Sequence, residues 1–147
     1  MPYPPQEFDI DAFHAEIDAV VMGRDTYEIE REMAEWPHSG KPVFVVTSRP
    51  IAGAPSLIAA RSGNLLALAD ELAGRGYRKI GIEGGGQLIR GLIAIGRLDV
   101  LEMAIIPLVL GDGIPLFPAG TPELPLSLVK CEPKSGGALH VVYKKAD

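Results

Sequence analysis

Three consecutive glycines, Gly84, Gly85 and Gly86, are the residues with the clearest capacity for ligand chemistry. They follow an apolar run at residues 78–82 and precede a helical pattern. Glycine lets the backbone approach a phosphate closely, and a helix N-terminus adds unpaired N–H donors and a positive dipole end. We expect this turn to hold a cofactor pyrophosphate, although a tight turn without a ligand gives the same pattern. The spacing does not fit the G-x-G-x-x-G dinucleotide fingerprint, because Ile89 stands where its last glycine would be.

Two other segments carry residue types that bind phosphate. Each follows an apolar run and combines hydroxyl groups with a guanidinium. The first segment contains Gly23, Arg24 and Thr26, and the second contains Thr47, Ser48 and Arg49. Ligands of open α/β sheets bind at the carboxyl ends of parallel strands, so three such ends are expected to converge on one long, charged ligand. Taken singly, Arg24 also fits a surface ion pair, and residues 48–50 also fit an ordinary turn.

Apolar periodicity predicts the elements that position these residues. The expected helices cover residues 8–17, 23–35, 64–72 and 87–95, and the third is expected to stop at Gly74 or Gly76. The expected strands cover 18–22, 42–47, 57–60, 78–82, 98–109, 126–132 and 139–145. Asp25 or Thr26 is expected to cap the second helix, and Asn64 the third. Strand–helix units followed by two antiparallel strands predict an α/β fold, with a mostly parallel sheet and a C-terminal hairpin at its edge.

The composition sets limits on function. The chain has 147 residues, which suits a single domain covering 1–147, and a net charge of −5, which argues against general binding to nucleic acid or anionic membranes. No apolar run approaches the roughly 20 residues of a membrane span. The N-terminus lacks the features of a signal peptide, so we expect a cytoplasmic protein. The single cysteine, Cys131, lies in an apolar run, and we expect it to be buried.

The remaining titratable residues show no pattern typical of catalysis or metal binding. The three histidines, His14, His38 and His140, have no acidic or cysteine partner at a telling spacing, and we assign them neither role. The acidic residues near the N-terminus fit the solvated face of a helix better than a proton source; they are Asp9, Asp11 and Glu16. Asp99 and Glu102 are expected to be strand-end surface charges. The catalytic residues are therefore left unassigned.

Four segments in a fixed order carry a resemblance to a known family. They are residues 22–28 (Met-Gly-Arg-Asp-Thr-Tyr-Glu), 45–49 (Val-Val-Thr-Ser-Arg), 83–88 (Glu-Gly-Gly-Gly-Gln-Leu) and 108–117 (Leu-Val-Leu-Gly-Asp-Gly-Ile-Pro-Leu-Phe). The chain resembles the dihydrofolate reductase-like superfamily. Within it, the chain resembles most the C-terminal reductase domain of the riboflavin-biosynthesis deaminase-reductase. The last segment favours this branch over dihydrofolate reductase itself.

The resemblance implies a three-layer fold with helices on both faces of the sheet, an NADPH site, a small-molecule substrate and a homodimer. Gly23, Arg24 and Thr26 would contact phosphate at a helix start. Thr47, Ser48 and Arg49 would receive the adenosine end and its 2′-phosphate. The pyrophosphate turn would comprise Gly84, Gly85, Gly86, Gln87 and Leu88.

The resemblance also implies a further strand upstream of Phe8, in the middle of the sheet, and the chain is expected to lack it. The strands at 78–82 and 98–106 would then have unpaired inner edges. Three explanations stay open. In the first, the start of the chain is truncated. In the second, residues 1–7 fill part of the gap. In the third, the two strands either close up on each other or pair with another chain. The expected function is an NADPH-dependent reductase of a small heterocyclic substrate, acting on CH-OH or CH-NH groups as in riboflavin biosynthesis. The alternative is a non-catalytic nucleotide-binding or structural dimeric module.

Overall fold

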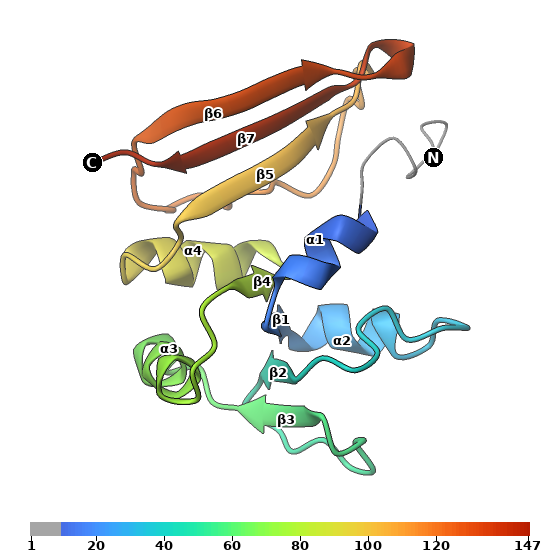
Figure 1. Cartoon of the computed structure of the whole chain (residues 1–147), viewed down its shortest axis with the longest axis vertical. Coiled ribbons are helices and arrows are strands. Elements are labelled where there is room, and N and C mark those ends of the chain that lie inside the picture. Colours follow the sequence, from blue (N-terminus) through green and yellow to red (C-terminus); the bar gives the residue numbers. More distant parts are fainter. Residues whose placement is uncertain (1–9) are drawn as a thin grey trace.

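The computed structural model describes residues 10–147 (Figure 1). The strands of this part of the chain form two sheets, and helices cover both faces of the first sheet. The helices are α1 (Ile10–Glu16), α2 (Arg24–Glu30), α3 (Leu65–Gly74) and α4 (Gly86–Ala94), with a short 3-10 helix, η2 (Ser135–Gly137). The strands are β1 (Ala19–Gly23), β2 (Val43–Val46), β3 (Ile58–Arg61), β4 (Ile80–Ile82), β5 (Val100–Ile105), β6 (Leu126–Pro133) and β7 (Leu139–Lys145).

The first sheet has four parallel strands in the order β3-β2-β1-β4, with β1 inside it. Successive side chains of a strand point to opposite faces, so β1 must be apolar at every position if both faces are covered. Ala19 and Val21 pack into one core cluster, and Val20 and Met22 pack into another. All four are at most 2% exposed. The continuous apolar run in the sequence is therefore explained by burial on both faces.

Helices cover both faces of this sheet, which confirms the predicted three-layer arrangement. On one face, Leu68 of α3 and Leu92 of α4 pack with Phe44 of β2. On the other face, Tyr27 of α2 packs with Ile17, which directly follows α1. Figure 1 shows α3 and α4 lying apart from α1 and α2, as two separate covering layers.

The second sheet is antiparallel, with the order β5-β7-β6. The predicted hairpin of β6 and β7 is confirmed, but its predicted place at the edge of the parallel sheet is wrong, because it pairs with β5 in a separate sheet. Within residues 10–147, β4 pairs only with β1, and β5 pairs only with β7, so each keeps one unpaired edge. The explanation in which these two strands close up on each other is wrong. The explanation that uses residues 1–7 lies outside the described residues.

Helix α2 differs from its prediction at its start. Strand β1 runs into α2 without a loop, so the N-cap is Gly23, and no side chain caps the helix. Asp25 and Thr26 lie inside the helix instead of capping it. The cap predicted for α3 is confirmed, because the Asn64 Oδ1 accepts a hydrogen bond from Ala67 N at 3.1 Å.

Helix α2 also ends at Glu30 instead of residue 35. The N–H of Met33 donates to the carbonyl of Glu30 at 3.1 Å, which makes a tight turn where a further helical turn was expected. The chain then reverses, and His38 returns to the end of α2 and contacts the Glu30 carboxylate. A buried polar pair thus holds the returning segment against the last residue of the helix.

Cys131 is exposed, contrary to the expectation of burial. It lies in β6, which is an edge strand of the antiparallel sheet. Its partner in register, Val141 in the middle strand β7, is 3% exposed. An apolar run in the sequence does not distinguish an edge strand from a central one.

Candidate functional site

The carboxyl ends of β1 and β2 and the glycine turn after β4 open onto one cleft of about 550 Å³. Sequence analysis predicted several of its lining residues, namely Gly23, Arg24, Thr26, Gly85, Gly86, Gln87 and Leu88. Two of the three predicted segments therefore share one cavity. Gly84, Thr47, Ser48 and Arg49 do not line it, although Val46, immediately before Thr47, does.

The glycine turn is held against the end of β1 by the backbone. The N–H of Gly23 donates to the carbonyl of Gly84 at 2.8 Å, and Gly84 has a φ of +89°, which favours glycine. Gly85 is the N-cap of α4, and no side chain caps this helix. The first N–H groups of α4 thus have no side-chain acceptor within residues 10–147. They lie where an anion in the cleft can accept from them.

Gly86 packs under the segment at 115–118. A Cβ at this position would lie 3.1 Å from Pro118 Cδ and 3.3 Å from the Leu116 carbonyl oxygen. The segment that carries the Ile-Pro-Leu-Phe residues of the sequence pattern therefore covers the start of α4. This close contact explains why the turn ends in glycine.

Arg24 connects α2 to the end of β2. Its Nε donates to Glu28 Oε1 at 2.7 Å, and its Nη1 approaches Thr47 Oγ1 at 3.5 Å and the Arg49 carbonyl at 3.3 Å. The bond from Arg24 is the main cause that holds the pKa of Glu28 below its usual value. Arg24 is thus an ion-pair partner and a lining residue of the cleft at the same time.

Thr47, Ser48 and Arg49 form the outer edge of this site. Thr47 Oγ1 accepts from the Arg49 N–H at 3.2 Å, which fixes the turn. Ser48 and Arg49 are exposed. Within residues 10–147, the guanidinium of Arg49 has no carboxylate within ion-pair distance, so its charge is available at the surface.

A fourth segment of the cleft was not predicted from the sequence. Gly63 and Leu65, at the turn between β3 and α3, line it together with Gly91 of α4. A Cβ on Gly91 would lie 2.6 Å from Leu65 Cδ1, so this glycine lets α3 and α4 meet closely. Gly91 is the residue that could have indicated this contact, because a glycine inside a helical pattern often marks a place where another element packs closely against the helix.

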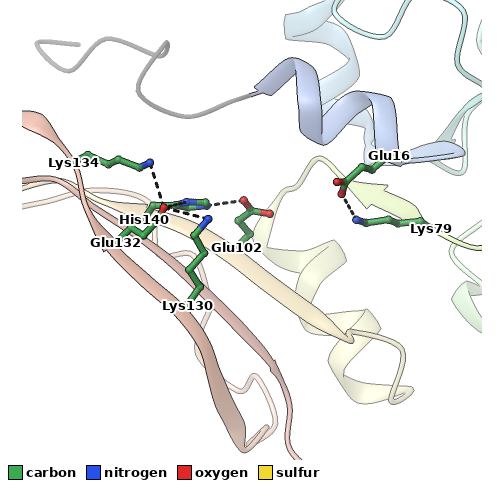
Figure 2. A network of polar contacts seen from close by, with 7 residues as sticks. All are labelled: Glu16, Lys79, Glu102, Lys130, Glu132, Lys134 and His140. Carbon is green, nitrogen blue, oxygen red and sulfur yellow. Dashed lines mark hydrogen bonds and ion pairs between the residues drawn. The ribbon is translucent and has the colours of Figure 1, made fainter.

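Two histidines have acidic partners in the folded chain that spacing along the sequence did not indicate. His38 Nε2 lies 2.9 Å from Glu30 Oε2, and His140 Nε2 lies 2.6 Å from Glu102 Oε1. Figure 2 shows the second pair, which belongs to the antiparallel sheet and not to the cleft. The partners of His140 come from a separate strand, so spacing along the sequence does not reveal them.

The sequence matches the profile of the RibD C-terminal domain family over residues 3–139, and the chain belongs to this family. It is 30% identical to the uncharacterized protein YwjB of Bacillus subtilis (strain 168), over 91% of this chain and 77% of that protein. It is 28% identical to the uncharacterized protein YyaP of the same organism, over 89% of this chain and 76% of that protein.

Solved structures show the same fold. A putative riboflavin biosynthesis protein from Shewanella sp. PV-4 matches with a TM-score of 0.84 and 25% identity, covering 95% of this chain and 80% of that one. A deaminase/5-amino-6-(5-phosphoribosylamino)uracil reductase from Thermotoga maritima matches with a TM-score of 0.72 and 15% identity, covering 98% of this chain and 50% of that one. The resemblance to the dihydrofolate reductase-like fold is confirmed. Among the helices of residues 10–147, none has the length and apolar character needed to cross a membrane.

Proposed function

We propose that the chain is an NADPH-dependent reductase of a small heterocyclic substrate, of the kind that reduces a pyrimidine in riboflavin biosynthesis. The observation that carries this proposal is the cleft of about 550 Å³, which is lined by the uncapped start of α4 and by Arg24. Membership of the RibD C-terminal domain family supports it. The hydride would come from the cofactor, and the protein would bind and orient the two reactants.

In this proposal, each segment of the cleft binds one part of the cofactor. The first turn of α4, with Gly85, Gly86 and Gln87, would donate backbone hydrogen bonds to the pyrophosphate. Arg24 would hold the end of β2 in place and add positive charge beside the phosphates. Arg49 would pair with the 2′-phosphate, because its guanidinium is exposed and has no ion-pair partner within residues 10–147.

A homodimer is part of the same proposal. Large apolar side chains are exposed around the antiparallel sheet and the segment after β5; they include Val100, Leu108, Val109, Leu110, Ile114, Leu128 and Val129. Val109 is 96% exposed and Ile114 is 97% exposed. Extended apolar surface of this kind marks an interaction site, and a second copy of the chain is the partner that we propose.

The alternative function is a nucleotide-binding module without turnover. The unpaired edges of β4 and β5 within residues 10–147 favour it, because the sheet that would support a substrate is interrupted there. Cofactor binding is common to both candidates, whereas turnover belongs only to the reductase.

Calorimetric titration with NADPH and NADH tests the cofactor site. We expect saturable binding of NADPH, with NADH weaker by about tenfold, or about 1.4 kcal/mol. Arg49→Ala should remove this preference by weakening NADPH alone. The matched control is Arg97→Ala, because Arg97 is also exposed and lies on another part of the surface. No saturable binding of NADPH would refute the proposal.

Gly23→Ala tests the pyrophosphate position without disturbing the fold. The added Cβ would lie 3.5 Å from the Gly84 carbonyl oxygen and 3.6 Å from Gly85 N, which are ordinary contact distances. It would cover the backbone that faces the cleft, so both cofactors should bind more weakly while the unfolding midpoint is unchanged. Oxidation of NADPH with pyrimidine substrates, followed by absorbance, then separates the two candidates. Binding without oxidation would favour the non-catalytic module.

A further inference from the structure

A second group of polar side chains is gathered near the carboxyl end of β4, and none of its members lines the cofactor cleft. His14 comes from α1, His38 from the turn after α2, and Glu83 from the residue that follows β4. One nitrogen or carboxylate oxygen from each lies within 4.8 Å of the others. Glu30, the last residue of α2, joins the group through its contact with His38.

His38 has one ring nitrogen without a hydrogen-bond partner. The side chain is 1% exposed, and its Nε2 contacts Glu30 Oε2 at 2.9 Å. Its Nδ1 is buried and has no partner within residues 10–147. When Nε2 donates to the carboxylate, the lone pair of the neutral ring is on Nδ1. A buried lone pair without a partner is costly unless a ligand satisfies it.

The carboxylates of this group point to a cation. Glu83 is half-buried, and its carboxyl group lies next to that of Glu30. Glu30 itself is only 9% exposed. Two carboxylates that are close together and buried repel each other, and either a proton shared between them or a bound cation removes this repulsion. The open nitrogen of His38 favours the cation, because a shared proton would leave that nitrogen unsatisfied.

We propose that His14, His38 and Glu83 bind a divalent transition-metal ion of the zinc type. Two imidazole nitrogens and one carboxylate form a ligand set that suits Zn²⁺ and leaves a fourth position open. Metal-binding histidines typically donate their other ring N–H to a carboxylate, and the contact of His38 Nε2 with Glu30 would supply this bond when Nδ1 binds the ion. Ligand atoms around one Zn²⁺ lie about 3.5 Å apart, so small rotations of half-buried His14 and Glu83 would close the site.

The His140 cluster provides the contrast. His140 also contacts a carboxylate, that of Glu102, and lies 4.0 Å from Glu132 Oε2. However, the ammonium groups of Lys130 and Lys134 lie 3.1 Å and 3.4 Å from the same Glu132 oxygen (Figure 2). These positive charges would repel a metal ion. His140→Gln is therefore a matched control, because it removes a carboxylate-paired histidine outside the proposed site.

The test measures metal binding directly and does not depend on the reductase proposal. The full chain, without an affinity tag and stripped with a chelator, is titrated with Zn²⁺ by calorimetry. Co²⁺ is then added in its place, and the visible absorption of a four-coordinate ion is recorded. We expect one ion per chain with a dissociation constant at or below the micromolar range. Glu83→Gln and His14→Ala should each weaken binding at least tenfold, and His140→Gln should leave it unchanged.

Two outcomes would overturn the proposal. One is the absence of saturable Zn²⁺ binding by the wild-type chain. The other is binding that persists unchanged in both Glu83→Gln and His14→Ala, since the ion would then lie elsewhere. Glu83→Gln keeps the shape of the side chain, and circular dichroism of both variants shows whether the fold is retained. The wild-type titration decides the question even if one variant fails to fold.

Discussion

Replacing Glu71 with glutamine tests the ion cluster that joins α3 to β3. Arg61 makes two bonds to this carboxylate, Nε to Oε1 at 2.8 Å and Nη2 to Oε2 at 2.7 Å. Arg75 adds a third, from Nη2 to Oε2 at 2.9 Å. Both guanidinium groups also lie over the ring of Phe44, at 5.4 Å and 5.6 Å from its centroid. Glu71 is thus the negative charge that lets two positive groups pack on one buried aromatic ring.

The pKa of Glu71 gives the size of the effect. The hydrogen bond from Arg61 is the largest cause that lowers it from 4.5 to about 2. A difference of this size corresponds to roughly 3 kcal/mol for a group shielded from water. The side chain is 29% exposed, so solvent screens the interaction, and we expect about 1 to 2 kcal/mol. Because the pKa is lowered by folding, this stabilisation is present above pH 4.5 and is lost as the pH falls towards 2.

Urea denaturation of wild type and Glu71→Gln across this pH range measures the contribution. The difference in free energy of unfolding should be about 1 to 2 kcal/mol at pH 7 and should shrink steadily below pH 4.5. Asp70→Asn is the control, because the Asp70 side chain is 68% exposed and its nearest cation, Arg97, is 3.6 Å away. A difference that is absent at pH 7, or that stays constant down to pH 3, would contradict the reasoning.

Two further predictions concern packing and assembly. Gly91→Ala should change the free energy of unfolding by less than about 1 kcal/mol, because the added Cβ would first meet Leu65 Cδ1, at 2.6 Å, which is the movable end of a half-buried side chain, and because alanine favours a helix interior over glycine. Chemical denaturation measures this, and a much larger loss of stability would contradict it. Val109→Glu should shift the chain from dimer to monomer in light scattering after size exclusion, whereas Ile29→Glu, at a side chain 67% exposed on α2, should not. A wild-type chain that is already monomeric would refute the dimer.

The parts of the fold that could be predicted are those encoded by neighbouring residues. The apolar run at 19–22 had to be buried on both faces, and the glycines at 84–86 had to be a turn before a helix. The convergence of Gly23 and Gly85 on one cleft also followed, because carboxyl ends of parallel strands share one edge of the sheet. These inferences need only strand direction and local pattern.

The parts that could not be predicted depend on tertiary neighbours. His14, His38 and Glu83 are far apart in the sequence, and only the packing of α1 and the turn after α2 against the end of β4 brings them together. Cys131 was predicted to be buried because its segment is apolar, but its strand forms an edge. Helix α2 was predicted too long: it ends at Glu30, the residue that His38 contacts in the folded chain.

The register of β1 has a consequence for how the chain folds. Ala19 pairs with Ile80, and Val20 pairs with Val43. Strand β1 is therefore synthesised early, but it gains its second neighbour, β4, only after residue 80 has been made. The β6–β7 hairpin, by contrast, pairs residues close in sequence, such as Pro133 with Leu139. Closing a long loop costs more entropy than closing a short one. The C-terminal hairpin is therefore expected to form quickly, and the slow step of folding is the arrival of β4 beside β1.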